Sequence, residues 1–168
     1  MKSKLVFAFF LVAMLFVSSS AANNVTIGDC EIALDFEDKE IISTPLDTSL
    51  SGDIIIETTT LLESSTKAFG FIYIHDFPTE QPIDDIEGAL ESTMDLFCGR
   101  VSIESYSDGF IANGLFIKGA QMCWGVSLPI DNVDGKMTQV LTVIAAFKDA
   151  DFNERLVKGV NIENLECG

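Results

Sequence analysis

Apolar and polar side chains alternate with a period of two residues along most of the chain after Cys30. This period predicts β-strands, because successive side chains of a strand point to opposite sides of its sheet. The first such stretch places Ile32, Leu34 and Phe36 on one side. The pattern predicts strands over residues 30–42, 54–62, 68–76, 100–106, 110–117, 121–129 and 136–147, with a short arm over 23–29 and a polar loop over 43–52.

The expected strand over 68–76 combines an aromatic side with an aliphatic one. Alternate positions give it one face of ring-bearing residues, formed by Phe69, Phe71, Tyr73 and His75. The other face contains Gly70, Ile72 and Ile74. Because neither face carries a charge before Asp76, at the end of the expected strand, this pattern allows the strand to be covered on both sides.

The period changes after Pro78, which we expect to end this strand because proline cannot donate to a sheet ladder. Apolar residues then recur at spacings of three and four, at Ile83, Ile86, Leu90, Met94 and Phe97. Acidic residues occupy the opposite side and gather in the first turns, where they complement the positive end of the helix dipole. The segment predicts one long amphipathic helix that ends near Gly99.

The rest of the pattern completes an α+β layout. Asp108-Gly109 and residues 131–135 predict tight turns, and the strand over 136–147 is the most apolar, which favours a central place in the sheet. Asp151 with Glu154 predicts a capping box for a short helix over 151–158, followed by a small edge strand containing Val160 and Ile162. We expect a mainly antiparallel sheet of six to seven strands, covered by one long amphipathic helix and a short C-terminal helix.

This order of elements resembles the Mog1/PsbP-like α/β/α sandwich, in which helices cover an antiparallel sheet. The resemblance is carried by patterns of apolar and turn residues in three segments: 107–112 (SDGFIA), 135–146 (GKMTQVLTVIAA) and 152–160 (FNERLVKGV). It covers roughly residues 28–165. Members of that family act mostly as non-enzymatic assembly or accessory proteins, so the resemblance implies this class of function and assigns no site residue.

Residues 1–22 have the three parts of a secretory signal peptide. Lys2 and Lys4 precede an uncharged run over 5–17, and small residues continue to Ala22. The run is shorter than the roughly 20 apolar residues that a membrane-spanning helix needs. We expect cleavage after Ala22, a single α+β domain over 23–168 and a secreted or extracytoplasmic location. The alternative is that the segment stays as an N-terminal anchor.

The chain is strongly acidic, with a formal net charge of −16. Removal of Lys2 and Lys4 with the signal peptide changes this charge to −18, because 26 acidic residues then face 8 basic ones. Binding to phosphate backbones and to anionic lipid headgroups depends on clustered Lys and Arg. The charge therefore argues against nucleic acid as a partner, and against membrane binding once the signal peptide is removed.

Four cysteines follow the signal peptide, at Cys30, Cys98, Cys123 and Cys167. An even number in a chain routed to an oxidising compartment predicts two disulfides. Their positions favour Cys30 with Cys167, which ties the ends of the domain, and Cys98 with Cys123. Free thiols are the alternative; zinc is disfavoured because the chain has no Cys-x-x-Cys pair and a single histidine, His75.

Few residues suggest a catalytic, ligand-binding or metal-binding role. His75 is the only base for a nucleophile triad, and we interpret it as a structural hydrogen-bonding residue. Residues 131–135 lack the ligand positions of a calcium loop and predict a hairpin turn instead. Trp124 is expected to pack over a disulfide, and Asn24 is a candidate glycosylation site in Asn-Val-Thr. No catalytic, cofactor-binding or metal-binding residue is predicted.

These observations predict an exported, acidic, non-enzymatic domain that binds or assembles with a protein or surface outside the cytoplasm. The alternative hypothesis is a weak calcium-binding or carboxylate-dependent glycan-acting enzyme. It requires two acids that converge in one concave pocket.

Overall fold

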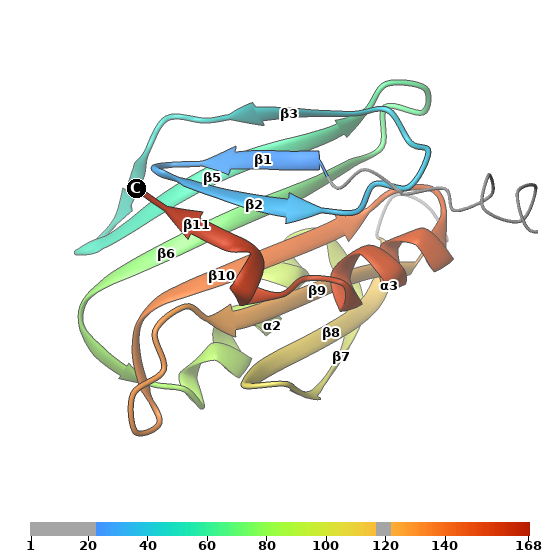
Figure 1. The fold of residues 1–168 in the computed structure, drawn as a ribbon. Helices are drawn as coiled ribbons and strands as arrows, with labels where there is room; N and C mark the ends of the chain where they lie inside the picture. The colour runs from blue at the N-terminus through green and yellow to red at the C-terminus, as the bar shows by residue number, and fades with distance from the viewer. Residues whose placement is uncertain (1–22, 117–121) are drawn as a thin grey trace, which may run out of the picture.

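The computed structural model describes residues 23–116 and 122–168, which form two antiparallel sheets and two α-helices (Figure 1). The small sheet has the order β1-β2-β11, with β1 (Asn23–Ile27), β2 (Cys30–Leu34) and β11 (Leu165–Cys167). The large sheet has the order β3-β5-β6-β10-β9-β8-β7, with β4 paired beside β3 on β5. Its strands are β3 (Ile41–Pro45), β4 (Ser49–Ser51), β5 (Ile54–Glu63), β6 (Phe69–Pro82), β7 (Cys98–Tyr106), β8 (Gly109–Phe116), β9 (Met122–Pro129) and β10 (Lys136–Ala146). The helices are α2 (Asp85–Asp95), α3 (Ala150–Lys158) and the 3-10 helix η2 (Ile162–Asn164).

The large sheet forms the middle layer of the molecule. The small sheet and α3 lie on one face of it, and α2 lies on the other face, behind β8 and β9 in Figure 1. The main core fills the space between the two sheets and α3, where Ile27, Ile32 and Phe152 are fully buried. A second apolar cluster lies between α2 and the large sheet, around Leu90 and Met94.

Strand β10 is the centre of the large sheet, as its apolar sequence predicted. It pairs with β6 on one side and β9 on the other. Leu141 and Val143 contribute to the core beneath the small sheet, whereas Ile144 and Ala146 belong to the cluster beneath α2. Both faces of the strand are thus buried, which explains why its apolar residues do not alternate with polar ones.

The predicted fold class is wrong in the number of strands. The large sheet has eight strands rather than six to seven, and the chain also forms a separate three-stranded sheet. The expected arm over 23–29 is β1, in which the buried Val25 and Ile27 alternate with exposed neighbours. The expected loop over 43–52 contains the end of β3 and the whole of β4. These strands are three to five residues long, too short for a clear period.

The prediction of one long amphipathic helix is also wrong. Helix α2 has 11 residues, and its buried stripe consists of Ile86, Leu90 and Met94. Ile83 precedes the helix and Phe97 follows it. Strand β6 continues to Pro82, past the expected end at Pro78. Its pairing with β10 jumps from Asp76–Gln139 to Gln81–Met137, so Pro78 lies in an irregular stretch where no ladder donor is needed.

Helix α3 agrees with the predicted short helix, but it is capped by Asp149 rather than Asp151. The Asp149 side chain accepts a hydrogen bond from the backbone N–H of Phe152 at 3.0 Å. After α3, η2 and β11 replace the expected edge strand at Val160 and Ile162.

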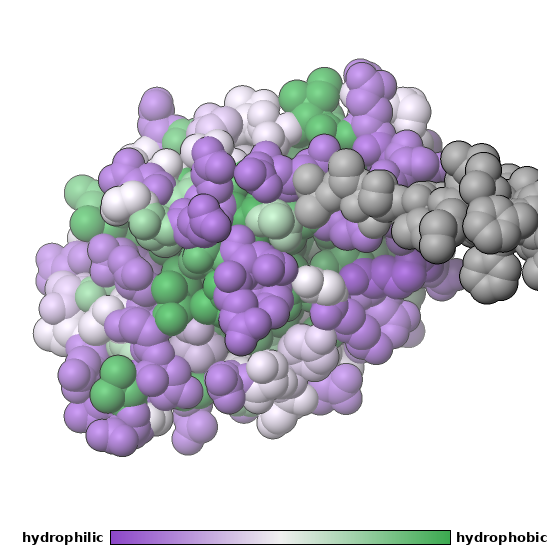
Figure 2. Space-filling model, viewed as in Figure 1, coloured by the Kyte–Doolittle hydropathy of each residue, from purple (hydrophilic) through white to green (hydrophobic). Residues whose placement is uncertain are grey.

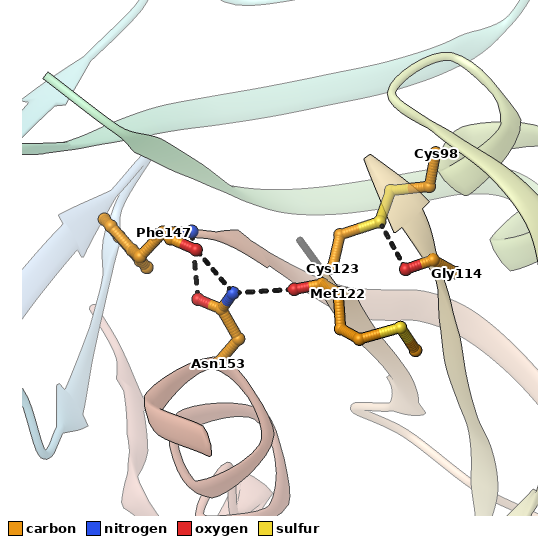
Figure 3. Close-up of a disulfide and its surroundings, with 6 residues drawn as sticks. All are labelled: Cys98, Gly114, Met122, Cys123, Phe147 and Asn153. Atoms are coloured by element: carbon orange, nitrogen blue, oxygen red, sulfur yellow. Dashed lines mark hydrogen bonds between the residues drawn. A yellow bond between two sulfur atoms is a disulfide. The ribbon is translucent and has the colours of Figure 1, made fainter. Parts of the chain in front are cut away.

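The four cysteines form two disulfides, in the pairing that their positions favoured. Cys30–Cys167 joins β2 to β11 across the small sheet. Cys98–Cys123 joins the start of β7 to β9 within the cluster beneath α2, and the Cys123 sulfur lies 3.4 Å from the carbonyl oxygen of Gly114 (Figure 3). Each bridge therefore connects strands that are distant in sequence.

Asn153 fastens α3 to the sheet from a fully buried position. Its side-chain oxygen accepts a hydrogen bond from the backbone N–H of Phe147 at 2.9 Å. Its side-chain nitrogen donates to the carbonyl oxygens of Phe147 and Met122 at 2.8 and 2.9 Å (Figure 3). Helix α3 is thereby held against the end of β10 and the start of β9.

Candidate binding groove

Within residues 23–116 and 122–168, no helix packs over one half of the large sheet on the α2 side. Helix α2 packs against β7, β8 and β9 and reaches only the near side of β10 and β6. The registers of β3, β5 and β6 place alternate residues on this side, which we name the open face. The open face consists of Ile42, Thr44, Ile54, Ile56, Thr58, Thr60, Leu62, Phe69, Phe71, Tyr73, His75 and Phe77.

None of the side chains on the open face is charged, although 21% of the residues in this chain are Asp, Glu, Lys or Arg. At the edge of the sheet formed by β3 and β5, the open face has accessible apolar side chains: Ile42 on β3 is 50% exposed, and its partner Leu62 on β5 is 37% exposed. The side of the molecule that carries the small sheet and α3 is different, because hydrophilic residues cover most of it and hydrophobic ones form only separate smaller areas (Figure 2). The open face is therefore a continuous uncharged surface on an acidic protein.

The five ring-bearing residues of β6 form a ladder along the open face. Ring centroids are 5.8 Å apart between Phe71 and Tyr73, 5.9 Å between Tyr73 and His75, and 6.4 Å between His75 and Phe77, with interplanar angles of 23 to 29°. Phe97, just after α2, stacks on Phe71 at 4.9 Å. Phe69 instead meets Phe71 edge to face, with ring centroids 5.4 Å apart and an interplanar angle of 64°. The stacked rings from Phe71 to Phe77 turn their faces toward one another, so this part of the ladder presents mainly ring edges.

Helix α2 forms a wall beside this ladder. Its residues Asp85, Ala89 and Thr93 line a pocket of about 280 Å³, together with His75 and Phe77 on β6, Ile56 on β5 and Thr142 on β10. We call the ladder, this wall and the pocket the groove. The end at His75 and Phe77 is its pocket end, and the end at Phe69 and Phe97 is its far end.

Burial shifts the titration of two groups in the ladder. It lowers the pKa of His75 below its ordinary value, because the charged imidazolium is poorly solvated between Tyr73 and Phe77. Burial also raises the pKa of Tyr73 to about 12. Both side chains are therefore uncharged at neutral pH, and the floor of the groove is electrically neutral.

The sequence-based candidates lie elsewhere in the molecule. The four cysteines are structural, and Asn24 is exposed on β1, where it is accessible for the predicted glycosylation. Trp124 does not pack over the Cys98–Cys123 disulfide. It points to the opposite side of β9 from Cys123, into the region of α3, where the Lys158 ammonium lies 5.4 Å from its ring centroid.

The segment over 131–135 is the predicted hairpin turn. Asp134 and Gly135 have φ angles of 53 and 78°, and Val133 pairs with Lys136 around them. The Asp131 carboxylate accepts hydrogen bonds from the backbone N–H groups of Thr138 and Gln139, at 2.9 and 2.7 Å. Partial burial alone would raise the pKa of Asp131, but these bonds and that from the Thr138 hydroxyl outweigh it and lower the pKa.

The acidic residues do not assemble into a metal site: the described ranges contain no group of three or more His, Cys, Asp or Glu arranged to hold an ion. Asp108 and Glu163 line a second pocket of about 310 Å³, between the β7–β8 turn and η2. The enzyme hypothesis requires two acids in one pocket, and this pocket of the described residues contains such a pair.

Comparisons with protein families, with curated proteins and with solved structures give no match to this chain. The resemblance to the Mog1/PsbP-like sandwich stays a prediction.

In the described part of the chain, no helix is both long enough and apolar enough to cross a membrane.

Sequence reasoning placed four rings of the ladder on one face of a strand but did not identify a groove. The pattern of β6 is compatible with cover on both sides. What leaves one side open is the position of α2 over β7–β9, which depends on strand order. The available clue was the lack of charge at alternate positions of two successive expected strands.

Proposed function

We propose that this protein is an exported, non-enzymatic binding protein that holds a ligand with an apolar body in the groove. The observation that carries the proposal is the uncharged open face. An accessible sheet surface without charges lowers the solubility of a protein, and its presence on a chain with net charge −16 therefore indicates a binding surface. The two disulfides are consistent with an extracytoplasmic site of action.

The composition of the groove favours binding over catalysis. His75, its only imidazole, packs between two aromatic rings and faces Ile56 and Val140 on the neighbouring strands. The Thr142 hydroxyl in the pocket is engaged by the Ser127 hydroxyl at 2.7 Å. An apolar hollow with a few polar groups is the usual composition of a ligand pocket.

Ring orientation favours an aliphatic body over a saccharide. Sugars stack on the faces of aromatic rings, whereas the rings of the ladder cover each other's faces at centroid distances of 5.8 to 6.4 Å. Ring edges and the methyl groups of Ile54, Ile56 and Leu62 instead form a surface suited to hydrocarbon.

The test uses Nile red, a neutral apolar dye, with the purified 23–168 protein. Neutrality of the dye matters because the protein repels anions. We expect saturable binding that is weakened at least tenfold in Thr58→Lys, which puts a charge opposite Tyr73 on the open face. Ser102→Lys, an equal charge change at an exposed position on β7, is the matched control and should bind as the wild type does. Equal binding by both variants would refute the groove as the binding site.

A further inference from the structure

We infer that the ligand of the groove is a cationic amphiphile, whose apolar chain lies along the ladder and whose ammonium-type head group occupies the pocket beside Asp85. This inference rests on the proposed function and adds the charge of the ligand to it. It follows from the pocket lining, from the distribution of charge around α2 and from the charges at the two ends of the groove.

The pocket has one formal charge. Of the described residues that line it, only Asp85 is charged at neutral pH, and none is Lys or Arg. A carboxylate or phosphate head group would therefore meet a like charge and no cation. An ammonium head group would meet the Asp85 carboxylate in a partly apolar setting, where a charge pair is stronger than in bulk water.

Helical spacing puts Asp85 on the groove side of α2 and the other exposed acids of that helix elsewhere. Asp85, Ala89 and Thr93 follow each other at intervals of four and line the pocket. Glu87 and Glu91 share the same interval on the other flank, because they are two residues out of phase. The helix thus turns a single carboxylate toward the hollow.

The ends of the groove differ in charge. Asp53, Asp84 and Asp134 lie near the pocket end, in the β4–β5 turn, before α2 and in the β9–β10 turn. The segment before α2 lies against the β9–β10 turn, because the backbone N–H of Ile83 donates a hydrogen bond to the carbonyl oxygen of Gly135 at 3.1 Å. The pocket end also has one basic residue, Lys136 at the start of β10, whose ammonium lies 3.2 Å from the Glu80 carboxylate.

Three other basic residues lie near the far end. Lys67 is in the β5–β6 turn, Lys148 follows β10, and Arg100 is near the start of β7. Pairing of Phe69 with Ala146 confirms that the β5–β6 turn and the end of β10 meet at this end. Acids accompany these cations at the far end, with Asp95 at the end of α2 and Asp149 beside Lys148. The pocket end is therefore the more acidic of the two, which favours a cation there.

The ladder gives the apolar chain a defined track. From Phe69 to His75 the strand advances by about 20 Å, at roughly 3.3 Å per residue. Uncharged groups line this track throughout, and Leu96, which is 73% exposed at the end of α2, extends the apolar wall near Phe97. A linear hydrocarbon chain matches this long, narrow, neutral strip.

The experiment compares three probes with one chain length: decyltrimethylammonium, decanol and decanoate, each displacing Nile red below its micellar concentration. We expect decyltrimethylammonium to bind at least tenfold more tightly than decanoate. Asp85→Asn should weaken decyltrimethylammonium binding about fivefold and leave decanol binding unchanged. Glu91→Gln, the same loss of charge on the other flank of α2, is the matched control and should change neither affinity.

A second variant keeps the test independent of any effect of Asp85 on the start of α2. Thr93→Lys puts a cation on the groove side of the helix, one turn from Ala89, and should reverse the preference toward decanoate.

Three outcomes would overturn the inference and leave the proposed function standing: equal affinities for all three probes, a preference for decanoate, or an equal effect of Glu91→Gln and Asp85→Asn, which would indicate only general attraction to an acidic protein. Failure of Nile red and all three probes to bind would instead refute the proposed function itself.

Discussion

His75 lies in the middle of an aromatic ladder, and its protonation should be visible in the stability of the protein. Its pKa is lowered in the folded state by burial, whereas the unfolded chain has the ordinary value of about 6.5. As the pH falls below about 6.5, the unfolded chain takes up a proton that the folded protein excludes. The free energy of unfolding should therefore decrease, and this loss should end once the pH is below the folded-state pKa.

The measurement is urea denaturation at about pH 7.5 and about pH 5.5, for the wild type and for His75→Phe, which keeps a ring in the ladder. Acidic groups near the groove, Asp85 included, are present in both proteins, so the difference between them isolates the imidazole. We expect a smaller loss of stability at low pH in His75→Phe. Equal losses in both proteins would contradict the prediction.

The buried side chain of Asn153 should contribute strongly to the stability of the protein. Asn153→Ala removes hydrogen bonds to the backbone N–H and carbonyl of Phe147 and to the carbonyl of Met122. Because these backbone groups would stay buried without partners, we expect a loss of about 2–4 kcal/mol in the free energy of unfolding. Asn132→Ala, at an exposed position, is the control and should change stability by less than about 0.5 kcal/mol.

At the scale of elements, two glycines should respond in opposite ways to the same substitution. A Cβ at Gly70 in β6 would lie 2.6 Å from the Ile144 carbonyl oxygen in β10, so Gly70→Ala should force the two central strands apart and cost about 1–3 kcal/mol. A Cβ at Gly88 in α2 meets nothing within 4 Å, so Gly88→Ala should stabilise the helix by about 0.5–1 kcal/mol. Thermal melts of both variants measure the signs, and the same sign for both would contradict this account.

Elements with a long, regular pattern were predictable from sequence, and short ones were not. The strands β5, β8, β9 and β10 agree with their expected ranges within the described residues, because burial imposes clear patterns on eight or more residues. Strands β1 and β4 were missed because three to five residues do not establish a period. The length of α2 was overestimated because Ile83 and Phe97 continue its apolar spacing outside the helix. Spacing alone does not distinguish a helical residue from an apolar neighbour that packs beside it.

The groove was not predictable for a different reason. Its residues come from strands whose sequences show which side chains share a face, yet not what lies above that face. Cover is decided by strand order, which places β3, β5 and β6 on one side of β10 and the strands beneath α2 on the other. The disulfide pairing was easier, because position along the chain already favoured it: Cys30 opens the first expected strand and Cys167 lies near the C-terminus.

For the whole molecule, the Cys30–Cys167 disulfide closes the longest loop and should matter most to the unfolded chain. It spans 137 residues, so its chain-entropy effect amounts to about 5 kcal/mol at most. We expect Cys30→Ser/Cys167→Ser to lower the free energy of unfolding by up to this amount. Because Cys167 is exposed, little packing is lost with it. Urea denaturation of the double variant measures the loss, and unchanged stability would contradict the predicted contribution of the bridge.

Net charge gives a further whole-molecule prediction. At −16 for the full chain, and −18 without residues 1–22, the acids repel each other more strongly in the folded protein than in the expanded chain. Sodium chloride should screen this repulsion and raise the melting temperature between about 0.01 and 0.5 M. Melts across this range test the prediction, which a constant or falling melting temperature would contradict.

The bridge between β2 and β11 also determines how the protein responds to a mechanical pull. Strands β3 to β10 and both helices lie between Cys30 and Cys167 in the chain, inside a covalently closed ring. Tension applied outside the bridge passes from one cysteine to the other through the sulfur–sulfur bond. Of the described strands, β1 alone precedes Cys30, and it would peel away from β2 one residue pair at a time. It would also lose the 2.6 Å hydrogen bond that the Thr59 hydroxyl on β5 donates to the Thr26 carbonyl oxygen. Apart from these contacts with β1, the large sheet and its groove lie inside the closed ring, so tension carried by the sulfur–sulfur bond would not pass through a ligand held there.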